Sequence, residues 1–334
     1  MLELGRFRLT RGGRLANAKL VYKTYGKLAE DRSNVILYPT SYGAHHSDID
    51  WLVRPGGILD SEKWFVVIAN MFGNGLSSSP SHGLDPGITF THDDNLRAQE
   101  TLLTQGLGVQ SLKLVYGWSM GAQQAYYWAV KRPHMVERFA AICGTAQTTP
   151  HNTLFLRSLE AALQSDPAWD GTRFNDVPRH GIRTFAFIYA SWAASQAFYR
   201  ERLYESLGYV SLDDYVKRAW EEQYLRRDPM NLLCMLRTWM CCDVAEYPEF
   251  NGDLRQALKA ITARALIMPS ATDLYFTPED CRAEADMIRG STYLPIPSIW
   301  GHRAGNPFQN PADEAFLREA VHNLLERPAK GART

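Results

Sequence analysis

Residues 117–121 read Gly-Trp-Ser-Met-Gly, and this stretch decides how the rest of the chain is interpreted. An apolar run at 112–116 precedes it, and a run with helical spacing at 122–131 follows it. A Gly-x-Ser-x-Gly sequence that turns a strand directly into a helix is typical of a nucleophile elbow. The glycines leave room for the tight turn, and the helix dipole favours negative charge near the exposed serine. We therefore predict that Ser119 is a nucleophile.

Strand-like runs alternate with helix-like runs on both sides of this stretch. Apolar composition predicts further strands at residues 34–39, 64–70, 138–143, 264–269 and 291–297. Helical spacing of the apolar residues predicts helices at 95–107 and 311–326. Continuous apolar strands separated by helices are typical of a sheet that is covered on both faces. The sequence thus predicts an α/β fold with a mostly parallel central sheet flanked by helices.

The region 150–260 interrupts this alternation. It contains no convincing buried strand, and its helical patterns are rich in tyrosine and tryptophan. We predict that 1–149 and 261–334 together form one core, and that 150–260 are a helical insertion over the ends of the strands. A lid is the functional interpretation of this insertion, and a purely structural extension is the alternative.

The charge balance and the cysteines limit the classes of partner and compartment. Lysine plus arginine number 36, as do aspartate plus glutamate, so nothing favours nucleic acid or a charged membrane surface. The N-terminus lacks the apolar segment of a secretory signal, and no apolar run approaches the length of a membrane span. The five cysteines match no zinc spacing and are expected to be reduced. We therefore expect a cytoplasmic protein.

A serine nucleophile needs a histidine base, and that histidine needs an acid that fixes its tautomer. After a nucleophile elbow the chain order is serine, acid, histidine. Asp273 lies in the loop after the predicted strand 264–269, and His302 lies in the loop after 291–297. The other histidines precede Ser119, lie just past the elbow helix, or fall in the insertion or the last helix. We predict that Asp273 is the acid and His302 the base.

The oxyanion hole of such a site uses two backbone amides. The residue after the nucleophile, Met120, is expected to supply one of them. The loop after the predicted strand 34–39 is expected to supply the other. We place this second donor at Ser41, with Thr40 or Tyr42 as alternatives.

The sequence offers little support for a metal or a nucleotide cofactor. His45 and His46 lie beside aspartates, but neighbouring residues on a regular strand point to opposite faces and cannot both bind one ion. The chain contains no His-Glu-x-x-His, no Gly-x-Gly-x-x-Gly and no Walker sequence. We therefore expect neither a metal nor a cofactor.

Several stretches together resemble the homoserine O-acetyltransferase family of the α/β-hydrolase superfamily. They are the loop 69–80, residues 94–99, the elbow at 117–124, and the pairs Thr272-Asp273 and Gly301-His302. The resemblance covers most of the chain. It implies the α/β-hydrolase fold, the triad of Ser119, Asp273 and His302, and an acyl-enzyme on Ser119. It also implies that 209–244 correspond to the lid of the family and that two copies pair through their lids as a homodimer.

Two positions depart from the transferases of that family. Trp118 replaces a glycine that usually precedes the nucleophile, and Arg303 replaces an aspartate that usually follows the catalytic histidine and meets the ammonium of homoserine. A guanidinium repels an ammonium, by on the order of a kcal/mol or more in a partly desolvated site. These departures make the chain more similar to the branch of the family that hydrolyses simple esters.

We therefore predict a serine hydrolase, a carboxylesterase that cleaves small esters with short acyl groups, acetyl above all. Ser119 attacks the carbonyl, His302 transfers the proton, and water releases the acyl group from the enzyme. Trp118 and Arg303 are expected to contact the substrate, and Trp118 together with the aromatic residues of the insertion would favour apolar groups. The alternative is an acyl-CoA-dependent O-acyltransferase. A non-catalytic binding protein is disfavoured because all three triad positions are filled.

Overall fold

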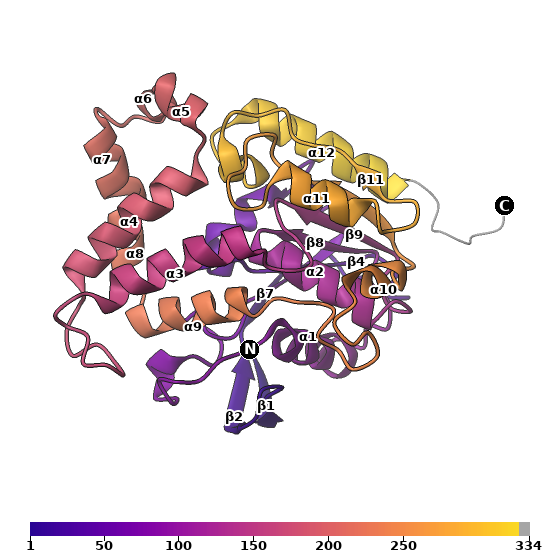
Figure 1. The fold of residues 1–334 in the computed structure, drawn as a ribbon. Coiled ribbons are helices and arrows are strands. Elements are labelled where there is room, and N and C mark those ends of the chain that lie inside the picture. Colours follow the sequence, from indigo (N-terminus) through magenta and orange to yellow (C-terminus); the bar gives the residue numbers. More distant parts are fainter. Residues whose placement is uncertain (327–334) are drawn as a thin grey trace.

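A seven-stranded sheet forms the centre of the protein in this computed structural model (Figure 1). The structure describes residues 1–326, so the end of the predicted core segment, 327–334, lies outside the described residues. From edge to edge the strands are β11 (Thr292–Tyr293), β10 (Arg264–Met268), β9 (Arg138–Ile142), β8 (Leu114–Trp118), β4 (Val35–Pro39), β7 (Phe65–Ala69) and β3 (Tyr22–Tyr25). All neighbours are parallel except β3, which is antiparallel to β7. The predicted sheet is confirmed.

Alternate side chains of the strands enter two hydrophobic cores, one on each face of the sheet. On β4, Val35 and Leu37 enter the first core, whereas Ile36 and Tyr38 enter the second. This alternation follows from the two-residue period of a strand. All four side chains are fully buried, which explains why the sequence of this strand is continuously apolar.

Helices cover both faces, as the sequence predicted. The first core is covered by α1 (His92–Thr101), α2 (Met120–Lys131), α10 (Leu254–Lys259) and α11 (Pro278–Ala285). The last helix, α12 (Pro311–Glu326), covers the second core with Leu317, Val321 and Leu324. The bounds of α12 are those predicted from its spacing.

A hairpin at the N-terminus has no counterpart among the predicted strands. It is formed by β1 (Leu2–Arg8) and β2 (Arg14–Leu20), which pair antiparallel. Most side chains of β1 are exposed or half-buried, so this strand gives no continuous apolar run. The predicted strand 291–297 is also only partly regular, because β11 is two residues long and pairing continues as one bridge between Ser270 and Ile296.

The helix predicted at 95–107 begins earlier than its apolar spacing indicates. The Thr91 hydroxyl accepts a hydrogen bond from the Asp94 amide, and the Asp94 carboxylate accepts one from the Thr91 amide. This capping box satisfies amides at the helix start and sets the first helical residue at His92. After Thr101 the chain continues as a π-helical turn, Leu102–Gly106.

Between β9 and β10 the chain forms helices and adds no strand to the central sheet, as far as residues 1–326 show. Figure 1 shows most of these helices together at one side of the sheet. Before α10 they are α3 (Pro150–Gln164), α4 (Arg179–Ala193), α5 (Gln196–Arg200), α6 (Leu203–Ser206), α7 (Leu212–Val216), α8 (Glu222–Leu225) and α9 (Pro229–Met240). The division into a core and an insertion at 150 and 260 stays a prediction.

Helices α3, α4 and α9 pack on loops at the carboxyl ends of the strands. Their apolar side chains form one cluster with Tyr42, which follows β4, Met120, which follows β8, and Tyr275, which follows β10. Ligands of open α/β sheets bind at this end of the strands. The helices between β9 and β10 therefore lie where a ligand site is expected.

The cysteines and the helices can be compared with the expectations from the sequence about disulfides and membrane spans. All five cysteines are free thiols, as predicted, and four of them are buried. Among the helices of residues 1–326, none has both the length and the apolar character required to cross a membrane.

Candidate active site

Ser119 occupies a strained turn between β8 and α2. Its φ is 59° and its ψ is −127°, a conformation that residues with a side chain rarely adopt. A Cβ on Gly117 would overlap the Gly121 carbonyl oxygen, and a Cβ on Gly121 would lie 2.7 Å from the Pro39 oxygen. Both glycines are therefore required by close backbone approach, as the sequence pattern indicates.

The structure brings His302 and Asp273 into direct contact. The His302 Nδ1 atom lies 2.7 Å from Asp273 Oδ2, and both side chains are almost completely buried. The second carboxylate oxygen, Oδ1, accepts the backbone amides of Tyr275 and Phe276, each at 3.1 Å. These bonds fix the orientation of the carboxylate. His302 in turn lies in a short 3₁₀ helix, Gly301–Gly305, that follows β11.

One cavity contains the proposed nucleophile and base together. Its volume is about 370 Å³, and both Ser119 and His302 line it. Ser41, Trp118 and Arg303, which the sequence assigned to the oxyanion hole and the substrate, line the same cavity. Asp273 and Met120 are not among the lining residues. Asp273 instead contacts His302 from within the protein, as the acid of a triad does.

The hydrogen bonds of the loop after β4 limit the choice of oxyanion donor. The Thr40 amide donates to the Ala69 carbonyl at 3.0 Å and is therefore not available to a ligand. Within the described residues, the amides of Met120, Ser41 and Tyr42 have no acceptor. The Ser41 hydroxyl donates to the Trp118 carbonyl, which ties this loop to the elbow. Met120 with either Ser41 or Tyr42 can therefore provide the two amides.

Trp118 and Arg303 both line the cavity together with His302. The Trp118 indole stacks on the His302 imidazole, with ring centres 5.3 Å apart and planes 27° apart. Arg303 donates a hydrogen bond to the Tyr215 hydroxyl at 2.9 Å, and no carboxylate of residues 1–326 forms an ion pair with it. The cavity thus has a flat apolar wall at Trp118 and an uncompensated positive charge at Arg303.

The family of the chain is decided by comparison with known proteins. The family model for the alpha/beta hydrolase fold matches residues 43–283, which is most of the chain. This chain is an α/β-hydrolase. The seven-stranded sheet, the elbow at Ser119 and the order of serine, acid and histidine are all expected in that fold.

Similar α/β-hydrolases include both esterases and transferases. An ethyl acetate hydrolase of Pseudomonas veronii is 36% identical, covering 90% of this chain and 88% of the relative. A homoserine O-acetyltransferase of Methanococcoides burtonii is 29% identical, covering 96% of this chain and 72% of the relative. The solved structure of the acetyl esterase MekB superimposes with a TM-score of 0.90 at 34% identity and covers 96% of each chain. The chain is thus more similar to these esterases than to that transferase.

Part of the cavity wall of this hydrolase comes from residues for which no individual role was predicted. The aromatic side chains from the region between β9 and β10 that line the cavity are Tyr189, Tyr209, Trp220 and Tyr224. The high aromatic content of that region was the signal for them. Tyr275 also lines the cavity, two residues after Asp273, and no motif indicated it.

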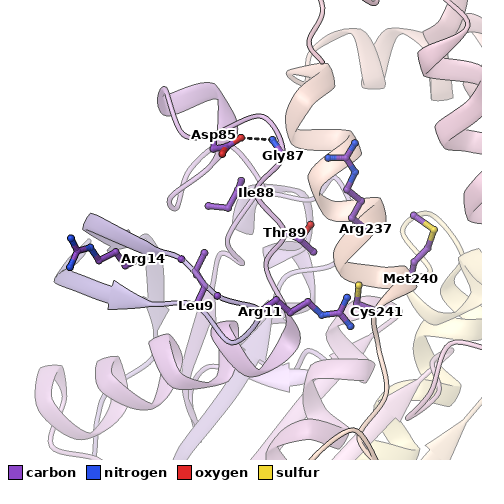
Figure 2. Close-up of a pocket in the computed structure, with 12 residues that line it drawn as sticks. Leu9, Arg11, Arg14, Asp85, Gly87, Ile88, Thr89, Arg237, Met240 and Cys241 are labelled. Atoms are coloured by element: carbon purple, nitrogen blue, oxygen red, sulfur yellow. Dashed lines mark hydrogen bonds between the residues drawn. The ribbon is translucent and has the colours of Figure 1, made fainter. Parts of the chain in front are cut away.

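A second cavity, of about 530 Å³, shares no lining residue with the first. Figure 2 shows Arg11, from the turn between β1 and β2, extending toward Cys241 at the end of α9. Its lining contains Cys241 and Thr89 but no histidine that could act as their base, and burial raises the pKa of the Cys241 thiol, which keeps it protonated. The larger cavity is therefore not the candidate active site.

The adjacent histidines of the sequence contact amides and do not form a metal cluster with one another. His45 Nε2 lies 2.9 Å from the Asn74 carbonyl oxygen, and His46 Nδ1 lies 3.1 Å from the Asn70 side-chain nitrogen. In the described part of the chain, the one close group of three potential metal ligands is Cys143, Asp273 and His302. Burial raises the pKa of the Cys143 thiol well above its usual range, which keeps it protonated and a poor ligand.

Proposed function

We propose that this α/β-hydrolase is a carboxylesterase that cleaves small esters with short acyl groups, acetyl above all, through an acyl-enzyme on Ser119. The observation that carries the proposal is the shared cavity. Ser119 occupies the elbow conformation and lines the same cavity as His302, whose ring is hydrogen-bonded to Asp273. Similarity to an ethyl acetate hydrolase and to an acetyl esterase supports the choice of acyl group.

The geometry gives each group of the triad a distinct role. With Nδ1–H donated to Asp273, the Nε2 atom of His302 is left as the acceptor for the Ser119 proton. The serine oxygen bonds to the acyl carbon, and the oxyanion accepts hydrogen bonds from the amides of Met120 and Ser41. The carbon–alkoxy bond then breaks, and His302 returns the proton to the departing alcohol. Water attacks the acyl-enzyme by the same steps and releases the acid.

The dimensions of the cavity support a small substrate, and its lining combines aromatic side chains with the charged Asp48, Arg218, Arg226 and Arg303. A volume of about 370 Å³ is at the lower end of ordinary ligand sites. Trp118 and the aromatic residues of the helical region present flat apolar surface to it. Such a wall can hold short alkyl groups without unsatisfied polar contacts.

The alternative function is an acyl-CoA-dependent O-acyltransferase that acts on homoserine. Both reactions use the same acyl-enzyme, so the reaction class depends on what binds beside His302. An acceptor alcohol must come within about 3 Å of the imidazole to lose its proton. The homoserine ammonium would then lie near Arg303, which has no carboxylate partner in residues 1–326. This charge disfavours the transferase.

The two functions are separated by a direct assay. We expect hydrolysis of p-nitrophenyl acetate and ethyl acetate without any cofactor, and no measurable O-acetylhomoserine from acetyl-CoA and homoserine. The products can be followed by titration of released acid and by mass spectrometry. The variant Arg303→Asp serves as the matched control, because it removes the repulsive charge from the same position. Efficient acetyl transfer by the unaltered chain, with only trace hydrolysis, would restore the transferase.

We also propose that residues 150–260 act as a lid on a core formed by 1–149 and 261–334. Tyr189, Trp220 and Tyr224 from this region line the cavity beside Ser119. A lid of this kind excludes water from the substrate and shapes the space for its alkyl groups. The free, mostly buried cysteines support a cytoplasmic location, which cell fractionation would test.

The proposed lid is also the proposed surface of a homodimer. Of the seven large apolar side chains that are exposed in residues 1–326, five belong to this region: Leu154, Val177, Phe187, Val210 and Leu212. Leu154 on α3 and Phe187 on α4 are 65% and 42% exposed, and these two helices pack against each other. We expect light scattering to give twice the mass of one chain. The double variant Leu154→Asp, Phe187→Asp should give the mass of one chain, and a monomeric native protein would contradict the proposal.

A further inference from the structure

The charges in the lining of the cavity at Ser119 are not balanced. The charged side chains that line it, apart from the base, are Asp48, Arg218, Arg226 and Arg303. Asp48 forms an ion pair at 2.5 Å with Arg227, which is not part of the lining, and Arg218 forms one at 3.0 Å with Asp214. Within residues 1–326, Arg226 and Arg303 form no ion pair. The cavity therefore has a surplus of positive charge.

The two unpaired arginines differ in their access to water. Arg226 is exposed, so water solvates its charge. Arg303 is half-buried and lies in the same 3₁₀ turn as His302, Gly301–Gly305. A charge that is partly shielded from water is stabilised by a partner of opposite sign. Because residues 1–326 supply no such partner to Arg303, an anionic group of a ligand is the partner that fits this position.

The guanidinium of Arg303 is held in place at one edge and open at the other. Its Nη1 atom donates to the hydroxyl of Tyr215 at 2.9 Å, and Tyr215 is fully buried. The guanidinium also lies over the Trp300 ring, with 5.6 Å between Cζ and the ring centre. The Nε and Nη2 atoms, which form the opposite edge, make no hydrogen bond with residues 1–326. Two parallel N–H groups of this kind match the two oxygens of a carboxylate.

We propose that Arg303 binds a carboxylate on the alcohol part of the ester, so that the preferred substrates are acetyl esters of small hydroxy acids. This inference rests on the proposed esterase function. His302 must reach the alcohol oxygen in order to protonate it. Arg303 follows His302 directly and lines the same cavity, so a group that meets Arg303 belongs to the alcohol part. The products are acetate and the free hydroxy acid, and the carboxylate takes no part in the bonds that form and break.

The test compares two acetyl esters that differ in charge and hardly in shape. In acetoxyacetate the alcohol part ends in a carboxylate, and in acetoxyacetamide it ends in a neutral amide. We expect the native protein to have the higher kcat/KM for acetoxyacetate. In Arg303→Gln the ratio of the two kcat/KM values should fall roughly tenfold, the effect of losing a charge-assisted pair of hydrogen bonds. The loss should appear mainly as a higher KM for acetoxyacetate, because the carboxylate is bound equally before and during the reaction.

Two further variants separate Arg303 from the general charge of the cavity. Arg218→Gln is the matched control, because Arg218 lines the same cavity but is already paired with Asp214. Its ratio of kcat/KM values should stay within about twofold of the native ratio. Arg303→Lys keeps the charge and loses the paired donors, so its ratio should lie between those of the native protein and Arg303→Gln.

Three results would overturn the proposal. They are a native protein that does not prefer acetoxyacetate, an Arg303→Gln variant that keeps the native ratio, and an Arg218→Gln variant that loses as much of the ratio as Arg303→Gln. The third would assign the preference to the overall charge of the cavity. If the glutamine variant does not fold, the native ratio and that of Arg303→Lys decide. A native protein that hydrolyses ethyl acetate without preferring acetoxyacetate refutes this proposal alone, whereas one that hydrolyses no acetate ester refutes the esterase function as well.

Discussion

Ser119→Ala removes ester hydrolysis, with an expected loss of at least roughly a thousandfold. The Ser119 hydroxyl lines the cavity and makes no hydrogen bond with the described residues, so its removal should leave the fold intact. Alanine accepts the positive φ of this position about as poorly as serine, and the strain of the elbow is therefore unchanged. The loss in rate should appear without a loss in Tm. Steady-state kinetics and thermal unfolding measure the two quantities on the same preparation.

A fluorophosphonate probe, which reacts with activated serines, tests the same residue independently of the substrate. The native chain should carry the label on Ser119, and Ser119→Ala should not be labelled. Ser191→Ala on α4 is the matched control, since Ser191 is exposed and its hydroxyl only donates to the Ile188 carbonyl. Labelling of another residue, or full activity of Ser119→Ala, would refute Ser119 as the nucleophile.

Asp273→Asn should lower kcat/KM by on the order of 10³–10⁴ while the loop keeps its shape. The reason lies in the two carboxylate oxygens. Oδ1 accepts the amides of Tyr275 and Phe276, so the oxygen of the asparagine will remain on that side. Its NH₂ group then faces His302 Nδ1, which must become an acceptor. The proton moves to Nε2, and the imidazole can no longer take the proton of Ser119.

The acid assignment is checked against two other aspartates. Asp280 lies in the first turn of α11, a few residues after Asp273, and Asp243 accepts a hydrogen bond from the Gln147 side chain at 2.9 Å. Their asparagine variants should retain most of the activity. If either of them loses a thousandfold while Asp273→Asn is mild, the acid has been assigned to the wrong residue.

The sequence could predict those parts of the structure that depend on residues close together in the chain. The glycines at 117 and 121 are needed because the backbone of the elbow approaches itself and Pro39 closely, and such a requirement is visible in a short motif. The strands of the sheet interior are buried on both faces and therefore appear as continuous apolar runs. Asp273 could be placed because it lies in the loop after such a run, β10, whereas His302 follows the short, half-buried β11 and was placed by the chain order of serine, acid and histidine.

The parts that the sequence could not predict depend on contacts between distant residues. The exclusion of Thr40 as an oxyanion donor rests on its bond to Ala69 in the neighbouring strand. The environment of Tyr275 depends on Phe155, which lies 120 residues earlier and reaches it through the packing of α3. The half-exposed β1 gives no apolar run because one of its faces meets solvent. The first two of these features have no local pattern that would reveal them.

The residues that react and the residues that shape the cavity come from different parts of the chain. The reacting groups come from short loops after β8, β10 and β11, whereas Tyr189, Trp220 and Tyr224 come from the helices between β9 and β10. Substitutions in these helices can thus alter which alkyl groups fit while Ser119 and His302 keep their positions. In evolution, the substrate range of such a protein can drift one side chain at a time without passing through an inactive ancestor. For an engineer, the same helices are the place to randomise when an esterase for a bulkier alcohol is wanted.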